Sequence, residues 1–568
     1  APTATPAPTP APTETPEPTP EPTPAEPTPT PAPPVPAGTY TYADADGGEW
    51  KLELRDDGLF TITDPDGKPH TGEGWSTAAD GSVHCGPTDI YFAPFAFNGG
   101  GSRREISRRT CPPPPRAGSK ILYPGRAETC PDRGETAMCA KETAKEFLRR
   151  HSMLYEQQPF EALTDAYIAD MRAGLRGEPS TLMMLPSFLP AASAPRTGES
   201  VLVLDAGGTN LRAGRVRFDE AGKPVTEALQ KRRMPGTLGE DTSAEEMFRA
   251  IAELALTVAL DADRACIAFS FPCECLPNGD GRIISMGKES RVTGAEGKLV
   301  CEGIETAMRA LGASGARRWR LINDTVGSML GGMASCDRSR YADFIGFILG
   351  TGTNACCHVK ASDVTKSPET VAMGGETLVN LESGCFGRAL RGTADFAVDE
   401  ASGLPGDHPA EKMISGAYYR LLLRETLLLA AREGLLSAKS GENIAALSIT
   451  SAMVDAFCLD PMGGNAVAEA LETEDDRRFA AEINTMLLER AARIAAACLC
   501  AILHERGFGA GKLTGICADG TMLKLNPVLR PRMEALIAEY AARHGLGGAE
   551  FLFAGDATLL GCAWAALA

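Results

Sequence analysis

Hydrophobic and polar positions divide the chain into stretches of different character. From about residue 138 onward, short apolar runs alternate with longer segments whose apolar residues recur every three or four positions. Short apolar runs are typical of buried strands, and the longer spacing is typical of amphipathic helices, so the alternation predicts an α/β architecture. The predicted strands are 201–205, 216–218, 266–271, 320–323 and 344–349, and the predicted helices are 248–260, 413–433 and 479–506.

Residues 39–97 follow a period of two. Trp50, Leu52 and Leu54 alternate with charged residues, and the Asp57-Gly58 dipeptide marks a tight turn after them. Alternation punctuated by Asp-Gly is typical of β-hairpins, so this segment is predicted to be a small all-β meander module.

Two further N-terminal segments lack any core-forming pattern. Residues 1–38 consist almost entirely of Pro, Ala, Thr and Glu, which predicts a disordered, extended linker; docking to a proline-binding domain is the alternative. Residues 98–137 show no periodicity and are interpreted as an irregular connector. The linker and meander resemble exported material, and one hypothesis is that the natural protein begins at Met138, with the upstream part a fusion or a mis-called start.

Composition excludes several classes of function. The formal net charge is −18 and the isoelectric point is about 5.0, which argues against general binding to nucleic acid. No apolar stretch reaches the roughly 18 residues needed to span a bilayer, and the longest, 494–503, is interpreted as a core helix. None of the 17 cysteines lies in a CxxC pair or in a zinc-like cluster with histidine, so we expect reduced, mostly buried thiols.

Two glycine-rich turns follow predicted strands. In the first, Asp205 ends a strand and Gly207, Gly208 and Thr209 follow it; in the second, 350–353 reads Gly-Thr-Gly-Thr. Glycines let backbone amides approach phosphate oxygens closely, and an acid at a strand end can hold hydrated Mg²⁺. Either turn alone could be an ordinary tight turn, but the pair indicates a nucleotide held between two related hairpins.

A third strand, between the two turns, ends at Asn323-Asp324. Transfer of a phosphoryl group to a hydroxyl needs a carboxylate that accepts the hydroxyl proton, and Asp324 is the candidate. The alternative interpretation is that both residues only cap the following helix.

Together the motifs resemble those of the eukaryotic-type hexokinase and glucokinase family, in that family's order, over roughly 430 residues. The resemblance implies a two-lobed, actin-like ATPase (ribonuclease H-like) sugar-kinase fold. In this fold, residues 200–321 would form the small lobe and residues 322–557 the large lobe. Residues 138–199 would form the helical N-terminal part of the large lobe, and residues 558–568 a helix that returns to the small lobe. The five motifs are 204–212 (LDAGGTNLR), 269–273 (FSFPC), 322–327 (INDTVG), 349–356 (LGTGTNAC) and 380–387 (NLESGCFG).

The resemblance also implies an activity and its residues. The expected reaction moves the γ-phosphoryl group of ATP to the 6-hydroxyl of a hexose such as glucose. In this reaction Asp324 is expected to act as the base, and Lys288 is expected to contact the sugar and the phosphoryl group. Asp205 and Asp324 are expected to hold Mg²⁺ through water. The other implied sugar contacts are Ser270, Pro272, Asn323, Asn354, Glu382 and Glu411. The implied ATP contacts are Asp205, Gly207, Gly208, Thr209, Asn210, Arg212, Thr351, Gly352, Thr353, Gly520, Thr521 and Thr558.

Some positions depart from the family pattern. Gly287 replaces a threonine, Ser383 replaces a tryptophan, and Leu559 and Leu560 replace a glycine and a base in the last turn. These departures prompt an alternative, a hexokinase-like sugar sensor with little turnover. A second alternative is an exported, surface-tethered protein; because free thiols are a liability outside cells, the kinase part is expected to be cytoplasmic.

Overall fold

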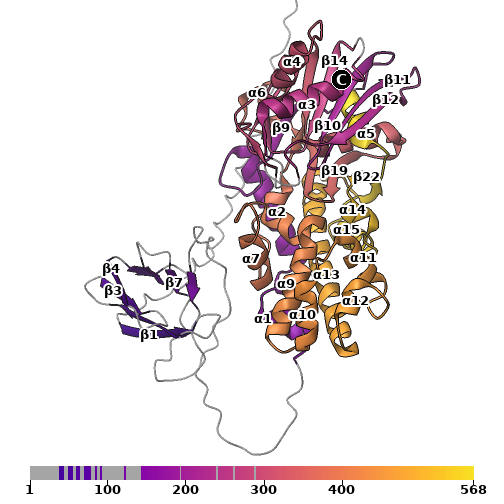
Figure 1. Ribbon diagram of the computed structural model, residues 1–568. Helices are drawn as coiled ribbons and strands as arrows, with labels where there is room; N and C mark the ends of the chain where they lie inside the picture. Colours follow the sequence, from indigo (N-terminus) through magenta and orange to yellow (C-terminus); the bar gives the residue numbers. More distant parts are fainter. Residues whose placement is uncertain are drawn as a thin grey trace, which may run out of the picture. The chain divides into compact units, whose positions relative to one another are not determined.

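A computed structural model provides the structure of the protein (Figure 1). It describes residues 142–191, 194–237, 241–259, 262–286 and 290–568, together with the backbone of eight short strands between residues 38 and 122. The chain divides into two compact units, residues 1–137 and 138–568. The predicted linker lies almost wholly outside the described residues, as does most of the predicted connector.

The first unit contains two four-stranded sheets. Strands β1 to β4 pair antiparallel in chain order, which is a meander. In the second sheet β7 and β8 are parallel, and β8 lies in the connector where the sequence predicts no element. A strand whose partner lies far back in the chain leaves no local signal. The bounds are β1 Gly38–Ala43, β2 Glu49–Leu54, β3 Leu59–Thr63, β4 Pro69–Glu73, β5 Trp75–Thr77, β6 Val83–Cys85, β7 Ile90–Phe92 and β8 Lys120–Leu122.

The smaller lobe of the second unit is built on a five-stranded sheet, at the top of Figure 1. Its strand order is β12-β11-β10-β14-β18, with a hairpin between β10 and β11 and parallel pairing of β10 with β14 and of β14 with β18. Side chains alternate across β10: Leu202 and Leu204 join the core under α3 and α4, whereas Val201 and Val203 join the core between the lobes. The bounds are β10 Ser200–Ala206, β11 Asn210–Phe218, β12 Pro224–Arg233, α3 Ala244–Leu256, β14 Arg264–Phe269, α4 Val300–Ala310 and β18 Arg318–Ile322, with short strands β13 Thr242–Ser243, β15 Cys273–Cys275, β16 Gly281–Ile283 and β17 Val292–Thr293.

The larger lobe repeats this topology. Its sheet order is β23-β22-β19-β20-β21-β9, so a hairpin of β19 and β20 again begins the unit, and β22 and β23 pair in parallel beyond it. Strand β9 is added at the edge, antiparallel to β21. The duplicated order confirms the predicted two-lobed α/β fold. The bounds are β9 Leu185–Pro190, β19 Asp343–Leu349, β20 Thr353–Lys360, β21 Glu376–Asn380, β22 Leu513–Asp519 and β23 Gly548–Leu552.

Helices cover the larger sheet and extend below it in Figure 1. The longest, α13, runs through the core, and residues 494–503 are almost completely buried in it. No helix among the described residues is long and apolar enough to cross a membrane. The bounds are α1 Ala144–Arg150, α2 Phe160–Arg176, α6 Pro368–Met373, α7 Thr393–Glu400, α8 Pro409–Ile414, α9 Gly416–Arg432, α10 Ala438–Ala446, α11 Ser451–Leu459, α12 Ala466–Ala470, α13 Glu474–Arg506, α14 Thr521–Leu525 and α15 Leu529–Arg543.

The predicted helix 413–433 is wrong in one respect, because the structure has two helices there. Ser415 is extended between α8 and α9, and the Gly416 amide donates to the Gly350 carbonyl oxygen at 2.7 Å. The helix is therefore interrupted at Ser415, and the Gly416 amide bonds the second glycine-rich turn. The other two predicted helices are present, but α3 begins four residues and α13 five residues before the predicted start.

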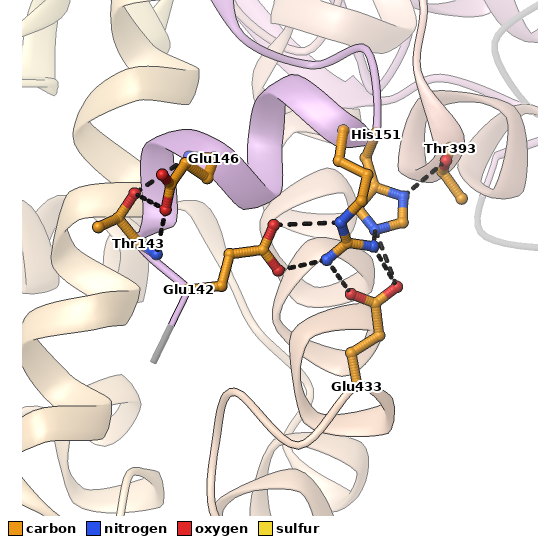
Figure 2. Close-up of polar contacts among 7 residues, drawn as sticks. Glu142, Thr143, Glu146, His151, Thr393 and Glu433 are labelled. Carbon is orange, nitrogen blue, oxygen red and sulfur yellow. Dashed lines mark hydrogen bonds and ion pairs between the residues drawn. The ribbon is translucent and has the colours of Figure 1, made fainter. Parts of the chain in front are cut away.

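Helix α1 is tied to the larger lobe by a polar cluster (Figure 2). Arg150 donates to Glu142 and to Glu433, at the end of α9, at 2.5 and 2.6 Å. Next to it, His151 contacts Glu433 at 2.9 Å and Thr393 at 3.0 Å. The start of the second unit is thus attached to two helices distant in sequence.

Helices α5 (Asp324–Ser335) and α16 (Ala557–Leu567) pack against each other. Helix α16 also packs against β10 and β14 of the smaller sheet, and α5 packs against β19 and β22 of the larger sheet. The approach of the two helices depends on glycine, because a Cβ on Gly331 would lie 1.9 Å from the Ala557 carbonyl oxygen, and one on Gly561 would lie 1.9 Å from that of Gly327. Leu559, 1% exposed, joins the apolar core beside this contact. The helix pair therefore fixes the position of Asp324, the first residue of α5.

Candidate active site

The first predicted phosphate turn is the hairpin between β10 and β11. Asp205 lies near the end of β10, the Gly207 amide donates to the Asn210 carbonyl oxygen at 3.0 Å, and β11 begins at Asn210. Gly208 is half-buried, whereas Thr209 and Asn210 are exposed. The turn therefore offers its backbone amides and the Thr209 hydroxyl to a ligand.

The second turn, between β19 and β20, is closed by a hydrogen bond from the Gly350 amide to the Gly352 carbonyl oxygen at 2.9 Å. Thr351 is exposed, and the buried Thr353 donates its amide to Glu411 Oε2 at 2.9 Å. This bond connects a predicted ATP turn to a predicted sugar residue.

Gly520 and Thr521, predicted on the adenosine side, lie beside the second turn. Gly520 has φ +115°, and a Cβ there would lie 2.2 Å from the Leu349 carbonyl oxygen. A side chain at this position would fill the space next to Gly350, so both the backbone conformation and the packing require glycine. The exposed Thr521 begins α14.

Acidic groups converge on the first turn. Asp205 is 7% exposed, and burial raises its pKa to about 6; the nearby Asp324 and Asp519 carboxylates raise the pKa further, while Arg212 opposes the shift. Arg212 Nε donates to Asp205 Oδ2 at 2.8 Å, and its NH1 group donates to Asp556 Oδ1 at 2.9 Å. Neighbouring carboxylates that raise the pKa of Asp205 are an arrangement that a divalent cation stabilises, because its charge relieves their repulsion.

Asn323 and Asp324, which directly follow β18, have different roles. Asn323 caps α5, since its Oδ1 accepts the Thr325 amide at 2.8 Å. The carboxylate of Asp324 is not the cap; it is half-buried, and among the residues that the structure describes only a long contact of 3.4 Å from the Thr325 hydroxyl reaches it. The capping interpretation is therefore correct for Asn323 and leaves the Asp324 carboxylate available for chemistry.

Predicted sugar residues are joined in a buried polar chain. Asn354 Nδ2 donates to Asn380 Oδ1 at 2.8 Å and approaches Asn323 Oδ1 at 3.4 Å. Asn380 Nδ2 donates in turn to Glu382 Oε1 at 2.6 Å. Glu382 and Glu411 are 8% and 5% exposed, so neither is the solvated acid that a charged residue usually is.

A cavity of about 10 Å³ lies against this chain, lined from the smaller lobe by Phe269, Phe271 and Cys273 and from the larger by Asn323 and Glu382, among others. The intervening Ser270 is 6% exposed, and its amide donates to the Ala206 carbonyl oxygen at 3.1 Å; Pro272 is also buried. A space of this volume holds about one water molecule. A larger ligand must displace side chains or separate the lobes.

One predicted residue, Lys288, lies outside the described residues, together with Gly287, and another, Thr558, is not brought to this site. Thr558 is buried in α16 against Gly327, 5% exposed, while Asp556 makes the contact to Arg212. Leu559 and Leu560 are helical core residues, which explains their departure from a glycine and a base.

Sequence reasoning missed three residues of the site: Asn380, Asp519 and Asp556. Asn380 is the first residue of the NLESGCFG motif, and Asp519 directly precedes the predicted Gly520, so in both cases a neighbouring predicted residue was the available signal. Asp519 Oδ1 accepts from the Gly520 amide at 2.7 Å and from Lys524 Nζ at 2.6 Å.

Comparison with known proteins agrees with this geometry. Two family models, both described as hexokinase, match residues 144–334 and 344–568. The chain belongs to the hexokinase family. The hexokinase-like 1 protein of Arabidopsis thaliana is 30% identical over 415 residues, which cover 66% of this chain and 81% of that protein. Hexokinase-3 of Homo sapiens is 30% identical over 397 residues, covering 66% of this chain, and the chain spans less than half, 42%, of that relative.

Solved structures of hexokinases share the fold. The hexokinase of Schistosoma mansoni, solved in complex with glucose, aligns with a TM-score of 0.61 at 24% identity, covering 74% of this chain and all of that one. A second hexokinase crystal structure gives a TM-score of 0.55 at 21% identity, with 74% and 98% of the two chains covered.

Proposed function

We propose that this member of the hexokinase family transfers the γ-phosphoryl group of ATP to the 6-hydroxyl of a hexose such as glucose. The observation that carries the proposal is the position of Asp324. Its carboxylate begins α5, close enough to the first glycine turn to raise the pKa of Asp205, and it adjoins Asn323 of the polar chain. A proton acceptor between a phosphate turn and a set of hydroxyl-binding side chains is what transfer to a sugar hydroxyl requires.

The glycine turns supply the nucleotide side of the site. Amides of Gly208 and Gly352, with the hydroxyls of Thr209 and Thr351, would contact phosphate oxygens, Gly207 would keep the first turn closed, and Gly520 would leave room for the nucleoside. The buried carboxylates fit a divalent cation, and Asp205 and Asp324 would hold Mg²⁺ through water. When bound, Mg²⁺ would neutralise charge on the phosphates.

The polar chain supplies the sugar side. Asn323, Asn354, Glu382 and Glu411 offer amide donors and carboxylate acceptors, which match hydroxyls that both donate and accept. In the transfer, Asp324 accepts the proton of the sugar hydroxyl while the hydroxyl oxygen bonds to the γ-phosphorus. The bond between the γ-phosphorus and the oxygen that bridges to the β-phosphate breaks, and ADP is released. Because the cavity holds about one water, we infer that the lobes part to admit hexose and close around it.

The deciding experiment measures hexose-dependent ADP release by the full chain with ATP, Mg²⁺ and a panel of hexoses. Asp324→Asn should lower kcat by roughly 10²- to 10⁴-fold, the usual contribution of a general base, and leave glucose binding by calorimetry nearly unchanged. Asp363→Asn is the matched control, because it alters an exposed acid that follows the end of β20 opposite the second glycine turn. A wild-type protein that binds glucose but phosphorylates no hexose would instead establish a sugar sensor.

A further inference from the structure

Three potential metal ligands meet outside the residues assigned to catalysis. Donor atoms of Cys385, Asp407 and His408 all lie within 4.8 Å of one another, and His408 Nδ1 is 3.1 Å from Asp407 Oδ2. The cysteine and the histidine are far apart in sequence, so the spacing of the chain does not reveal the cluster. The fold thus brings a cysteine and a histidine together that lie apart in the sequence.

The cluster connects the two segments that carry the sugar-site acids. Cys385 ends the 3-10 helix Ser383–Cys385, which directly follows Glu382, and His408 directly precedes α8, which contains Glu411. These two elements pack against each other. His408 has φ +48°, in the left-handed region that is costly for a residue with a side chain, so the surrounding structure holds it in place.

The accessibility of the cluster suits an exchangeable ion. The Asp407 side chain is 47% exposed, the His408 side chain is 14% exposed, and Cys385 is half-buried. One side of the cluster is therefore open to solvent, while the thiol and imidazole are partly shielded. An arriving ion also meets the negative charges of Glu382 and Glu411, which lie close enough to act on Cys385 and His408 respectively.

We propose that Cys385, Asp407 and His408 form a Zn²⁺ site and that its occupation lowers the affinity for hexose. Sulfur, imidazole nitrogen and carboxylate oxygen are the ligands that Zn²⁺ prefers, and three protein ligands leave a fourth position for water. On binding, the Cys385 thiol releases its proton to solvent as the sulfur bonds to the metal, and His408 releases the proton that it shares with Asp407 as its ring nitrogen bonds to the metal. Mg²⁺ does not compete effectively, because it prefers oxygen ligands in octahedral geometry.

The effect on hexose follows from the distances and rests on the function proposed above. Zinc–ligand bonds of about 2.0–2.3 Å in tetrahedral geometry set the separations of the donor atoms, which here are 3.1 Å for His408 Nδ1 and Asp407 Oδ2 and at most 4.8 Å for the other pairs. Adjusting to those separations moves the segment carrying Glu382 relative to the segment carrying Glu411. Hydrogen bonds to hydroxyls depend on positions within a few tenths of an ångström, so the sugar site loses affinity.

Metal binding is tested first, without any catalytic readout. The full-length, reduced protein is titrated with Co²⁺, whose thiolate charge-transfer absorption reports a Cys ligand, and Zn²⁺ is added in competition. We expect one ion per chain, with affinity reduced by roughly tenfold or more in Cys385→Ser and in His408→Gln. Cys336→Ser, which removes another half-buried thiol at the end of α5, should bind like the wild type. A charge-transfer band that persists in Cys385→Ser, or no band at all, overturns the site.

The second arm measures the hexose KM with and without Zn²⁺ at saturating ATP and Mg²⁺. In the wild type and in Cys336→Ser we expect Zn²⁺ to raise the hexose KM, whereas in His408→Gln it should leave that variant's own KM unchanged. A metal-binding protein whose KM does not respond to Zn²⁺ refutes the regulatory part of the proposal. Failure of the proposed hexokinase function would appear separately, as absent turnover in a protein whose Co²⁺ titration still succeeds.

Discussion

Arg212 and Asp205 face each other across the β10–β11 hairpin, and the guanidinium Nε donates to the carboxylate Oδ2 at 2.8 Å. This pair sits at the first glycine turn, and the other end of the guanidinium reaches Asp556 before α16. The hydrogen bond from Arg212 stabilises the ionised form of Asp205, which burial and the neighbouring carboxylates destabilise. The ionisation of Asp205 is therefore a sensitive property of the proposed nucleotide site.

The first prediction concerns pH. The folded-state pKa of Asp205 is raised, mainly by burial, from 3.8 to about 6, so the native carboxyl keeps its proton to a higher pH than in the unfolded chain. Its charge is present only above about pH 6, and binding of a magnesium nucleotide should weaken below that value. From about pH 7 to about pH 5.5 the ionised fraction falls about fourfold, and we expect the KM for the magnesium–ATP complex to rise by a similar factor.

The nucleotide also takes up protons in this range, so the comparison needs a variant. Asp205→Asn cannot titrate, and its pH dependence gives the contribution of ATP alone. The wild type should show the steeper rise in KM. Equal slopes in the two proteins would show that Asp205 does not control nucleotide binding.

The second prediction concerns Asn380, which sequence reasoning missed. Asn380→Ala removes the buried hydrogen bonds that Asn380 makes with the Asn354 amide and the Glu382 carboxylate. Loss of buried hydrogen bonds of this kind costs about 1–3 kcal/mol, which corresponds to a roughly 5- to 150-fold higher hexose KM when these side chains bind the sugar. The magnesium–ATP KM should change little, because the side-chain hydrogen bonds of Asn380 go to Asn354 and Glu382 rather than to either glycine turn. Steady-state kinetics against both substrates measures this.

Asn443→Ala is the matched control for that substitution. Its side-chain amide donates to the Ala470 carbonyl oxygen between α10 and α12, away from the polar chain. A similar rise in hexose KM in both variants would mean that Asn380 acts through general stability rather than through the sugar site.

The sequence predicted the parts of the molecule that local patterns encode. Apolar runs ending in Gly-Gly-Thr or Gly-Thr-Gly located both hairpin turns, and Asp324 followed from a strand ending on adjacent polar residues. Strand β12 was missed because most of its side chains are exposed or half-buried, so it carries no apolar run. Edge strands of this kind are specified by their partner more than by their own residues.

Other features depend on contacts that no local pattern contains. The break at Ser415 exists because Gly416 bonds Gly350, and Asp556 joins the site only through Arg212. In the same way, Thr558 matched a family turn loosely but lies in a helix, where packing against Gly327 determines its place.

The third prediction concerns the contact between α5 and α16. Gly331→Ala places a methyl group where the Ala557 carbonyl oxygen lies, so one helix must move. We expect a loss of about 1–3 kcal/mol, measured as a lower Tm, together with reduced kcat because α5 begins at Asp324. Gly403→Ala, which adds a methyl group in open space, should leave Tm and kcat nearly unchanged. An unchanged Tm in Gly331→Ala would show that the helices separate without cost.

The last prediction concerns acid stability at the cluster in Figure 2. The pKa of His151 is lowered, first by burial and then by Arg150, although Glu433 opposes the shift. The pKa of Glu433 is also lowered; burial opposes this shift, but hydrogen bonding and charge from Arg150 and His151 outweigh it. In both cases the unfolded chain binds protons more readily than the native state, so stability falls as pH falls.

The loss should begin as pH drops through about 6.5, where His151 in the unfolded chain becomes protonated, and continue below about 4.5 through Glu433. Each group contributes a slope of at most about 1.4 kcal/mol per pH unit. Because the raised pKa of Asp205 acts in the opposite direction over this range, the prediction concerns the difference between two curves of Tm against pH, measured on the full chain between about pH 7.5 and pH 5. As pH falls, the Tm of the wild type should decrease relative to that of His151→Gln. His544→Gln, which removes a histidine beside Glu161, should leave the slope unchanged. If instead His151→Gln keeps the full wild-type slope, another group is responsible for the acid sensitivity.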